Sequence, residues 1–258
     1  MKKDERQDIV LSEICCQCLK GIQDVYYALV YGLLSLREYR VMQERFRNIS
    51  PQIQTEGDWL RIRYEGMGVA FSISDDAINL YKPIIQEFQC FGSAVRVLSM
   101  YENYIKRIVE IADHQIPDKM IRFRSIHNIR SGRTTAIKSF WSNELGRGID
   151  FLQEVFGWNP SPHYKPGLKL WFHLRNLTVH NNGIADDKLC QLARNPHIES
   201  VGNIKAGDKA SWNIGNTLQL PQFIILILTD ADPYVFNNLN LPTRKQQPFW
   251  RVDNALTS

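Results

Sequence analysis

The sequence predicts a mainly α-helical protein with a small β-hairpin insertion and a long N-terminal helical region. Three observations lead to this class. Long segments carry apolar residues at helical spacing, one short stretch after Pro51 alternates apolar and polar residues, and prolines and glycines gather between the helical segments. The composition, with 44% hydrophobic and 22% charged residues among 258, is that of a globular protein.

The first helical segment spans about residues 8–47, which contain no proline and carry apolar residues every three or four positions from Ile22 to Leu33. The spacing predicts one or two long helices. Apolar residues then alternate from Leu60 to Tyr64 and again from Val69 to Ile73, which predicts a two-stranded hairpin between about Trp59 and Ile73.

A second, longer helix is expected after Ser74–Asp76, whose side chains suit an N-cap, with Pro83 in the first turn. Its apolar positions step by four and three and define one buried seam: Ile84, Phe88, Phe91, Val95, Leu98, Glu102, Ile105, Val109 and Ala112. Glu102 breaks the seam, and an unpaired buried charge costs several kcal/mol. Glu102 should therefore have a cationic or hydrogen-bonding partner or face a polar cleft; a structural ion pair, or a seam that drifts to the surface, remains the alternative.

A basic stretch from Lys119 to Asn143 contains no acidic residue. Its six cations are Lys119, Arg122, Arg124, Arg130, Arg133 and Lys138. Such a stretch, a loop followed by a helix, can neutralise RNA phosphates, although a solvated basic face is the commoner explanation. A short helix over Leu145–Phe156 then ends at Gly157 and a proline cluster.

The segment Leu168–Asp186 carries an apolar stripe beside a polar stripe of His173, Asn176 and His180, with Arg175 alongside. Asn181-Asn182-Gly183 is typical of a helix C-cap. Four further elements are expected, in chain order: a helix over Ile184–Arg194, a strand pair around Lys209–Ile214, a helix over Pro221–Val235 and a polar tail.

Arg175, Asn176 and His180 could serve phosphoryl chemistry without a metal. An imidazole titrates near neutral pH, a guanidinium suits a phosphate, and RNA supplies its own 2′-hydroxyl nucleophile. Five residues in a regular helix separate two side chains by about 140°, so convergence of Arg175 and His180 requires the helix to end or distort near His180. A histidine at a helix C-terminus and an arginine paired to an acid are the structural alternative.

The stretch Arg-Asn-Leu-Thr-Val-His, followed by Asn-Asn-Gly-Ile-Ala-Asp, resembles the signature of the HEPN superfamily of helical domains, which includes prokaryotic RNases, toxins and phage-defence proteins. The resemblance covers roughly residues 83–235 and implies a HEPN-like helical bundle. Residues 1–75 and the long stretch 113–167 have no assigned counterpart. The expected division is an N-terminal helical region with the hairpin (1–75), a HEPN-like domain (76–240) and a polar tail (241–258).

By this resemblance the chain is expected to be an endoribonuclease that leaves a 2′,3′-cyclic phosphate and acts as a homodimer. The implied catalytic residues are His180 as acid or base, Arg175 on the phosphate, Asn176 as orienter and Glu102 as a positioning group. RNA is the expected substrate, and an antitoxin or a nucleotidyltransferase is a further expected partner. A non-catalytic HEPN module that binds a nucleotide, RNA or a protein is the second hypothesis.

No cofactor or metal is expected, because the remaining histidines show no ligand spacing. Five cysteines, three of them crowded at Cys15, Cys16 and Cys18, favour reduced thiols over a disulfide framework. No membrane span and no secretion signal are recognised, so a cytoplasmic protein is expected.

Overall fold

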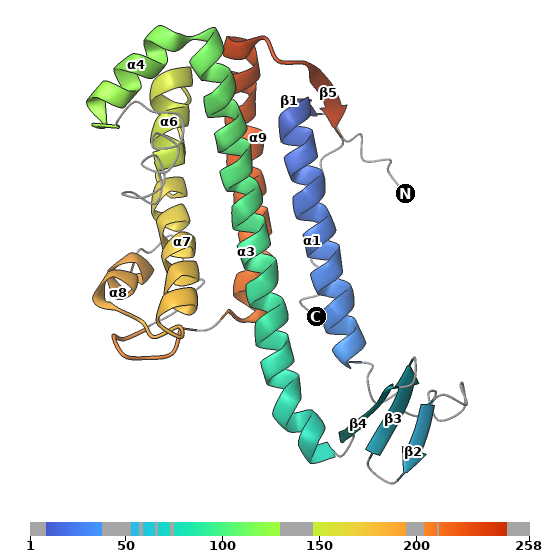
Figure 1. The fold of residues 1–258 in the computed structure, drawn as a ribbon. Helices are drawn as coiled ribbons and strands as arrows, with labels where there is room; N and C mark the ends of the chain where they lie inside the picture. The colour runs from blue at the N-terminus through green and yellow to red at the C-terminus, as the bar shows by residue number, and fades with distance from the viewer. Residues whose placement is uncertain are drawn as a thin grey trace, which may run out of the picture.

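The computed structural model describes residues 9–37, 53–56, 59–64, 67–72, 75–129, 147–194, 204–210 and 212–246. Over these ranges the chain is mainly helical, with seven helices and two small antiparallel sheets (Figure 1). The elements are β1 (Ile9–Ser12), α1 (Glu13–Arg37), β2 (Ile53–Glu56), β3 (Trp59–Tyr64), β4 (Met67–Ser72), α3 (Asp75–Gln115), α4 (Pro117–Ile126), α6 (Arg147–Phe156), α7 (Tyr164–His180), α8 (Asp187–Ala193), α9 (Ile214–Leu239) and β5 (Thr243–Gln246).

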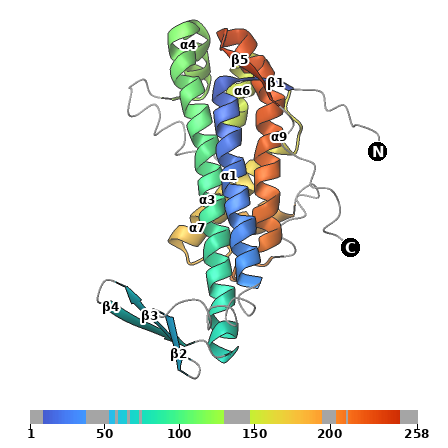
Figure 2. The ribbon, with the colours of Figure 1, turned by 90° about the vertical axis from the view of Figure 1, so that its right-hand side faces the viewer.

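The bundle is built around α3, which packs against α1 and α9 (Figures 1 and 2). On its other side α6 and α7 follow one another along the bundle, with α4 at one end and α8 at the opposite end (Figure 1). Buried aliphatic and aromatic side chains from all of these helices form one continuous core. None of the helices in the described ranges has the length and apolar character needed to cross a bilayer.

A buried carboxylate joins α1, α3 and α9. Asp232 has no exposed surface, and it accepts hydrogen bonds from the backbone N–H of Ser12 at 2.6 Å, the Ser12 hydroxyl at 2.7 Å and the Tyr104 hydroxyl at 2.8 Å. The Ser12 Oγ also accepts from the backbone N–H of Cys15, which caps α1. The start of α1 is therefore fixed to the core by one side chain of α9.

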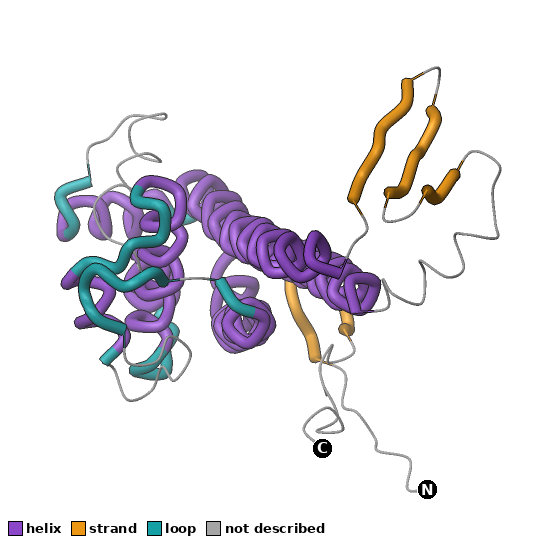
Figure 3. Tube along the Cα trace, turned by 90° about the horizontal axis from the view of Figure 1, so that it is seen from below, coloured by secondary structure: helices purple, strands orange, loops and turns teal. Residues whose placement is uncertain are grey.

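The predicted hairpin is present as β3 and β4, paired from Trp59↔Ser72 to Tyr64↔Met67. The prediction missed β2, which adds a third strand to β3. This sheet lies beyond the N-terminal end of α3, clear of the bundle in the view from below (Figure 3). At the other end of α1, β5 pairs with β1 in a separate two-stranded sheet.

Two predictions about α3 are wrong. Pro83 lies inside the helix rather than in its first turn, because α3 already begins at Asp75; the missing proline N–H leaves the Asn79 carbonyl without its intrahelical bond. The apolar members of the seam from Leu98 to Ala112 are buried and Glu102 is half-buried, but the start of the seam is open, where Phe88 is 71% exposed. The N-terminal part of α3 extends past the start of α9 (Figure 1). At Phe88 it lies beside α1, where Val25 and Leu29 of α1 and Phe88 of α3 line an open hollow, so Phe88 stays exposed.

The C-terminal part also differs from the prediction. No strand pair forms among the described residues of 209–214. Lys209 makes an isolated bridge with Ile184, and α9 begins at Ile214. The expected start at Pro221 is wrong because Asn213 caps the helix, accepting from the Asn216 N–H at 2.8 Å. The helix predicted over 184–194 begins at Asp187.

Cys15 and Cys18 lie three residues apart on α1 but contact different neighbours. The Cys15 thiol lies 4.0 Å from the Leu228 carbonyl of α9, whereas Cys18 donates to the Met100 carbonyl of α3 at 3.4 Å. Burial raises the pKa of both thiols, that of Cys18 to about 12. Both sulfur atoms therefore serve as neutral packing groups near neutral pH.

Candidate functional site

The C-terminal half of α7 carries the Arg-x4-His segment. Buried Leu170, Leu174 and Leu177 turn one face of the helix to the core, which leaves Arg175 half-buried and His180 exposed. The helix stays regular through His180 and ends directly after it. The predicted C-cap lies at this point, where Asn182 and Gly183 have φ values of 50° and 76°.

The turn after His180 is held in place by the loop that contains Ala210. The Gly183 N–H donates to the Leu177 carbonyl at 3.0 Å, and the Gly183 carbonyl accepts from the Ala210 N–H at 2.7 Å. A Cβ at Gly183 would lie 2.8 Å from the Ala210 oxygen. Glycine is required there by its positive φ and by this close backbone contact.

The guanidinium of Arg175 has three neighbours that fix its orientation. Nη1 donates to Glu102 Oε1 at 3.2 Å, and Nε and Nη2 both donate to Asn176 Oδ1, at 3.3 and 3.2 Å. Its Cζ also lies 4.9 Å from the centre of the Phe172 ring. The structure thus brings Glu102 of α3 together with Arg175 and Asn176 of α7.

This ion pair is reachable from solvent, since the side chains of Arg175 and Glu102 keep 22% and 28% of their surface exposed. A guanidinium has five N–H groups, and three of those of Arg175 are used by Glu102 and Asn176. Two N–H groups therefore have no acceptor among the described residues and can bind an anion.

His180 does not share the direction of Arg175. Because α7 is regular through His180, the two side chains leave the helix about 140° apart and about 7.5 Å apart along the axis. The arginine faces α3, whereas the histidine is exposed at the end of the helix. One helix therefore does not direct both groups at a single atom.

A second polar pair beside the motif was not predicted from the sequence. His173 Nε2 lies 2.8 Å from Asp186 Oδ1, and the same oxygen accepts from the Leu189 N–H at 2.7 Å as the N-cap of α8. Partial burial opposes ionisation of Asp186, but the Leu189 N–H and His173 together hold its pKa below the usual range. The signal was present, because His173 lies on the predicted polar stripe and Asp186 ends the extended motif.

The described part of the basic stretch is not brought to the motif. Lys119 donates to the Val155 carbonyl at 3.3 Å and to Asn238 Oδ1 at 3.0 Å, Arg124 forms an ion pair with Asp113, and Arg122 is exposed. These residues belong to α4, at the opposite end of the bundle from the end of α7 (Figure 1). Arg130, Arg133 and Lys138 lie outside the described residues.

Within the described ranges, no group of three or more His, Cys, Asp and Glu side chains is arranged to hold a metal ion. Comparisons of the chain with protein-family models, with curated proteins and with solved structures found no match.

Proposed function

We propose that the chain is a metal-independent endoribonuclease of the HEPN type. The contact between Glu102 and Arg175 is the observation that carries this proposal. A carboxylate from α3 and an amide from α7 hold a guanidinium at the surface, and two of its N–H groups have no acceptor in the part of the chain that the structure describes. That arrangement suits a group that must bind a phosphate in one fixed orientation.

In the proposed reaction, the 2′-hydroxyl of RNA attacks the adjacent phosphorus and expels the 5′-oxygen of the next nucleotide. Arg175 stabilises the charge on the phosphate oxygens, and Glu102 and Asn176 position Arg175. His180 accepts the proton of the 2′-hydroxyl or donates one to the leaving oxygen. The products are a 2′,3′-cyclic phosphate and a free 5′-hydroxyl.

The directions of Arg175 and His180 favour a homodimer as the active form. Groups about 140° apart on one helix do not meet the same phosphate. Two copies related by a twofold axis would combine the guanidinium of one chain with the imidazole of the other, and would supply both an acid and a base.

The test is to incubate the protein with cellular RNA in EDTA and to follow intact RNA. Wild type should cleave, and His180→Ala and Arg175→Ala should lose cleavage by about 100-fold or more. His114→Ala is the matched control, because it removes an exposed histidine of α3 and should leave cleavage unchanged. Equal amounts of intact RNA with wild type and both variants would end the proposal.

A non-catalytic HEPN module is the second candidate, and the divergence of Arg175 and His180 within one chain favours it. In that case the same substitutions change binding of RNA, nucleotide or a protein partner, and no cleavage occurs. Toxicity on expression separates the two candidates. His180→Ala should relieve the toxicity of a ribonuclease, whereas it should not relieve any toxicity of a binding module.

A further inference from the structure

A groove of about 460 Å³ lies between α4 and the C-terminal end of α6, far from the Arg-x4-His segment (Figure 1). One wall is a single stripe of α4 at helical spacing, made by Lys119, Arg122, Phe123 and Ile126. The opposite wall is formed by residues 154–157 at the end of α6. The volume is within the range of sites that accept a ligand or a few side chains.

The apolar part of the groove rests on the rigid core. Phe123 is 2% exposed and its ring packs edge-on against Phe151, with ring centres 5.6 Å apart. Val155 and Phe156 are likewise buried, whereas Ile126 is 58% exposed at the rim and Ile121 is 64% exposed on the same helix. Ile126 therefore presents a large aliphatic side chain to solvent beside a preformed apolar floor.

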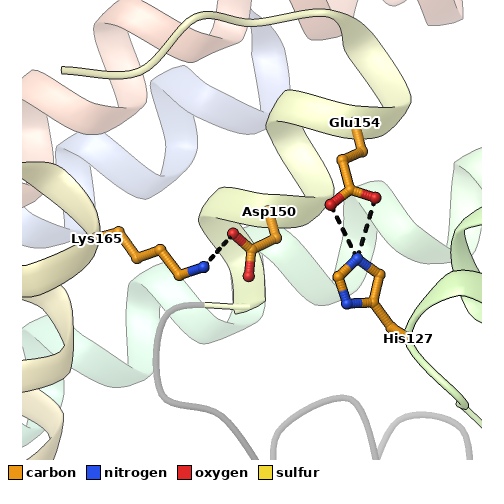
Figure 4. A network of polar contacts seen from close by, with 4 residues as sticks. All are labelled: His127, Asp150, Glu154 and Lys165. Atoms are coloured by element: carbon orange, nitrogen blue, oxygen red, sulfur yellow. Dashed lines mark hydrogen bonds and ion pairs between the residues drawn. The ribbon is translucent and has the colours of Figure 1, made fainter. Parts of the chain in front are cut away.

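The charged groups of the groove differ in their availability. Glu154 is held by His127, whose Nε2 lies 2.9 Å from Oε1 and 3.0 Å from Oε2 (Figure 4). Lys119 is bound to the end of α6 and to Asn238. Among the described residues Arg122 has no hydrogen-bond or ion-pair partner, so its forked donors are available to a ligand.

We propose that this groove docks an acidic, apolar segment of a partner protein. A large apolar side chain of that segment fills the space between Phe123, Ile126 and Val155, and a neighbouring carboxylate pairs with Arg122. The chemistry matches an amphipathic helix or strand laid along α4. This inference does not rest on the proposed ribonuclease activity.

RNA is the less suitable occupant of the same surface. Phosphate binding draws on several free cations, but Lys119 and Arg124 are already bound to protein groups and Glu154 adds a negative charge at the rim. The exposed Ile126 gains little from a phosphate backbone, whereas an apolar side chain of the partner would remove it from water.

In the experiment, a displayed library of random peptides is selected for binding to the full chain. The peptides have about 12 residues, which is long enough for about three helical turns. Enriched peptides should combine Asp or Glu with a large apolar residue. Added to ¹⁵N-labelled protein, they should shift the amides of residues 119–127 and 153–157. Arg122→Gln should weaken binding about tenfold and Ile126→Ala about fivefold.

Matched controls are Arg96→Gln and Leu226→Ala, which change an exposed arginine and an exposed leucine on other faces and should leave binding unchanged. The proposal is overturned if no peptide is enriched, if enriched peptides lack acidic residues, or if the shifts fall elsewhere. It is equally overturned if a short single-stranded RNA shifts the groove amides in a salt-dependent way and the peptides do not.

Discussion

Replacing Tyr104 by phenylalanine removes one hydroxyl from the buried carboxylate that joins three helices. In the wild type, Asp232 accepts from Ser12 twice and from the Tyr104 hydroxyl at 2.8 Å, and none of its surface is exposed. The ring of Tyr104 stays in place in the variant, so the loss is confined to one hydrogen bond to an ionisable group.

The expected magnitude depends on the ionisation of Asp232. A hydrogen bond to a charged group contributes about 1.5–3 kcal/mol to the free energy of unfolding, and one to a neutral group about 0.5–1.5 kcal/mol. Burial raises the pKa of Asp232, and the bonds from Ser12 and Tyr104 oppose that rise. Loss of the Tyr104 bond should therefore raise this pKa further.

The sign of the pH dependence follows from linkage. A carboxyl group whose pKa is raised in the folded state contributes stability below its unfolded pKa of about 3.9 and loses that contribution as pH rises through the folded pKa. This loss of stability with rising pH is larger in Tyr104→Phe, because the pKa of Asp232 is raised further there. The difference in stability between wild type and variant should therefore be smallest below about pH 4 and largest near pH 7.

Urea unfolding at several pH values measures this difference, and Tyr101→Phe is the matched control. Tyr101 is three residues earlier on α3 and fully buried, but its hydroxyl has no hydrogen-bond partner among the described residues. Removing an unsatisfied hydroxyl should be neutral or stabilising by about 1 kcal/mol. The reasoning is refuted if both variants are equally destabilised, or if the cost of Tyr104→Phe is the same at pH 4 and pH 7.

Three further predictions concern other contacts. Gly183→Ala should lower the free energy of unfolding by about 2–4 kcal/mol in urea unfolding, and Gly157→Ala, with a similar φ of 74° but open space around it, by only about 1 kcal/mol. Asp186→Ala should lower the free energy of unfolding by about 1–2 kcal/mol at neutral pH. Because the pKa of Asp186 is lowered in the folded state, this contribution is lost as pH falls from about 4 through that pKa. The stabilities of wild type and Asp186→Ala should therefore converge in acid. Alkylation of Cys18 at neutral pH should be slow until the protein is unfolded, as mass spectrometry of the modified thiols can show.

Periodicity predicted most of the helices and the hairpin of β3 and β4, because these features depend on residues close together in the chain. The same local reasoning placed Pro83 and Pro221 at helix starts, and the structure has both prolines inside helices. Proline marks a boundary only where the surrounding packing does not continue the helix, and packing is not visible in a local pattern.

A cationic or hydrogen-bonding partner for Glu102 was expected because this carboxylate lies on an apolar seam, and the family resemblance indicated Arg175 or His180. In the structure the partner is Arg175. The bonds between Ser12 and Asp232 offered no such sign. These residues are 220 positions apart, and the pattern around each of them is ordinary for a helix. Only the three-dimensional arrangement of α1 and α9 brings them together.

The fold also separates the two proposed activities. The guanidinium of Arg175 lies at the contact of α3 and α7, whereas the groove beside Arg122 lies between α4 and α6 at the other end of the bundle (Figure 1). Changes at distant sites without shared partners have additive effects. Ile126→Ala should therefore leave RNA cleavage intact, and His180→Ala should leave peptide binding intact. Each proposal can then fail without the other.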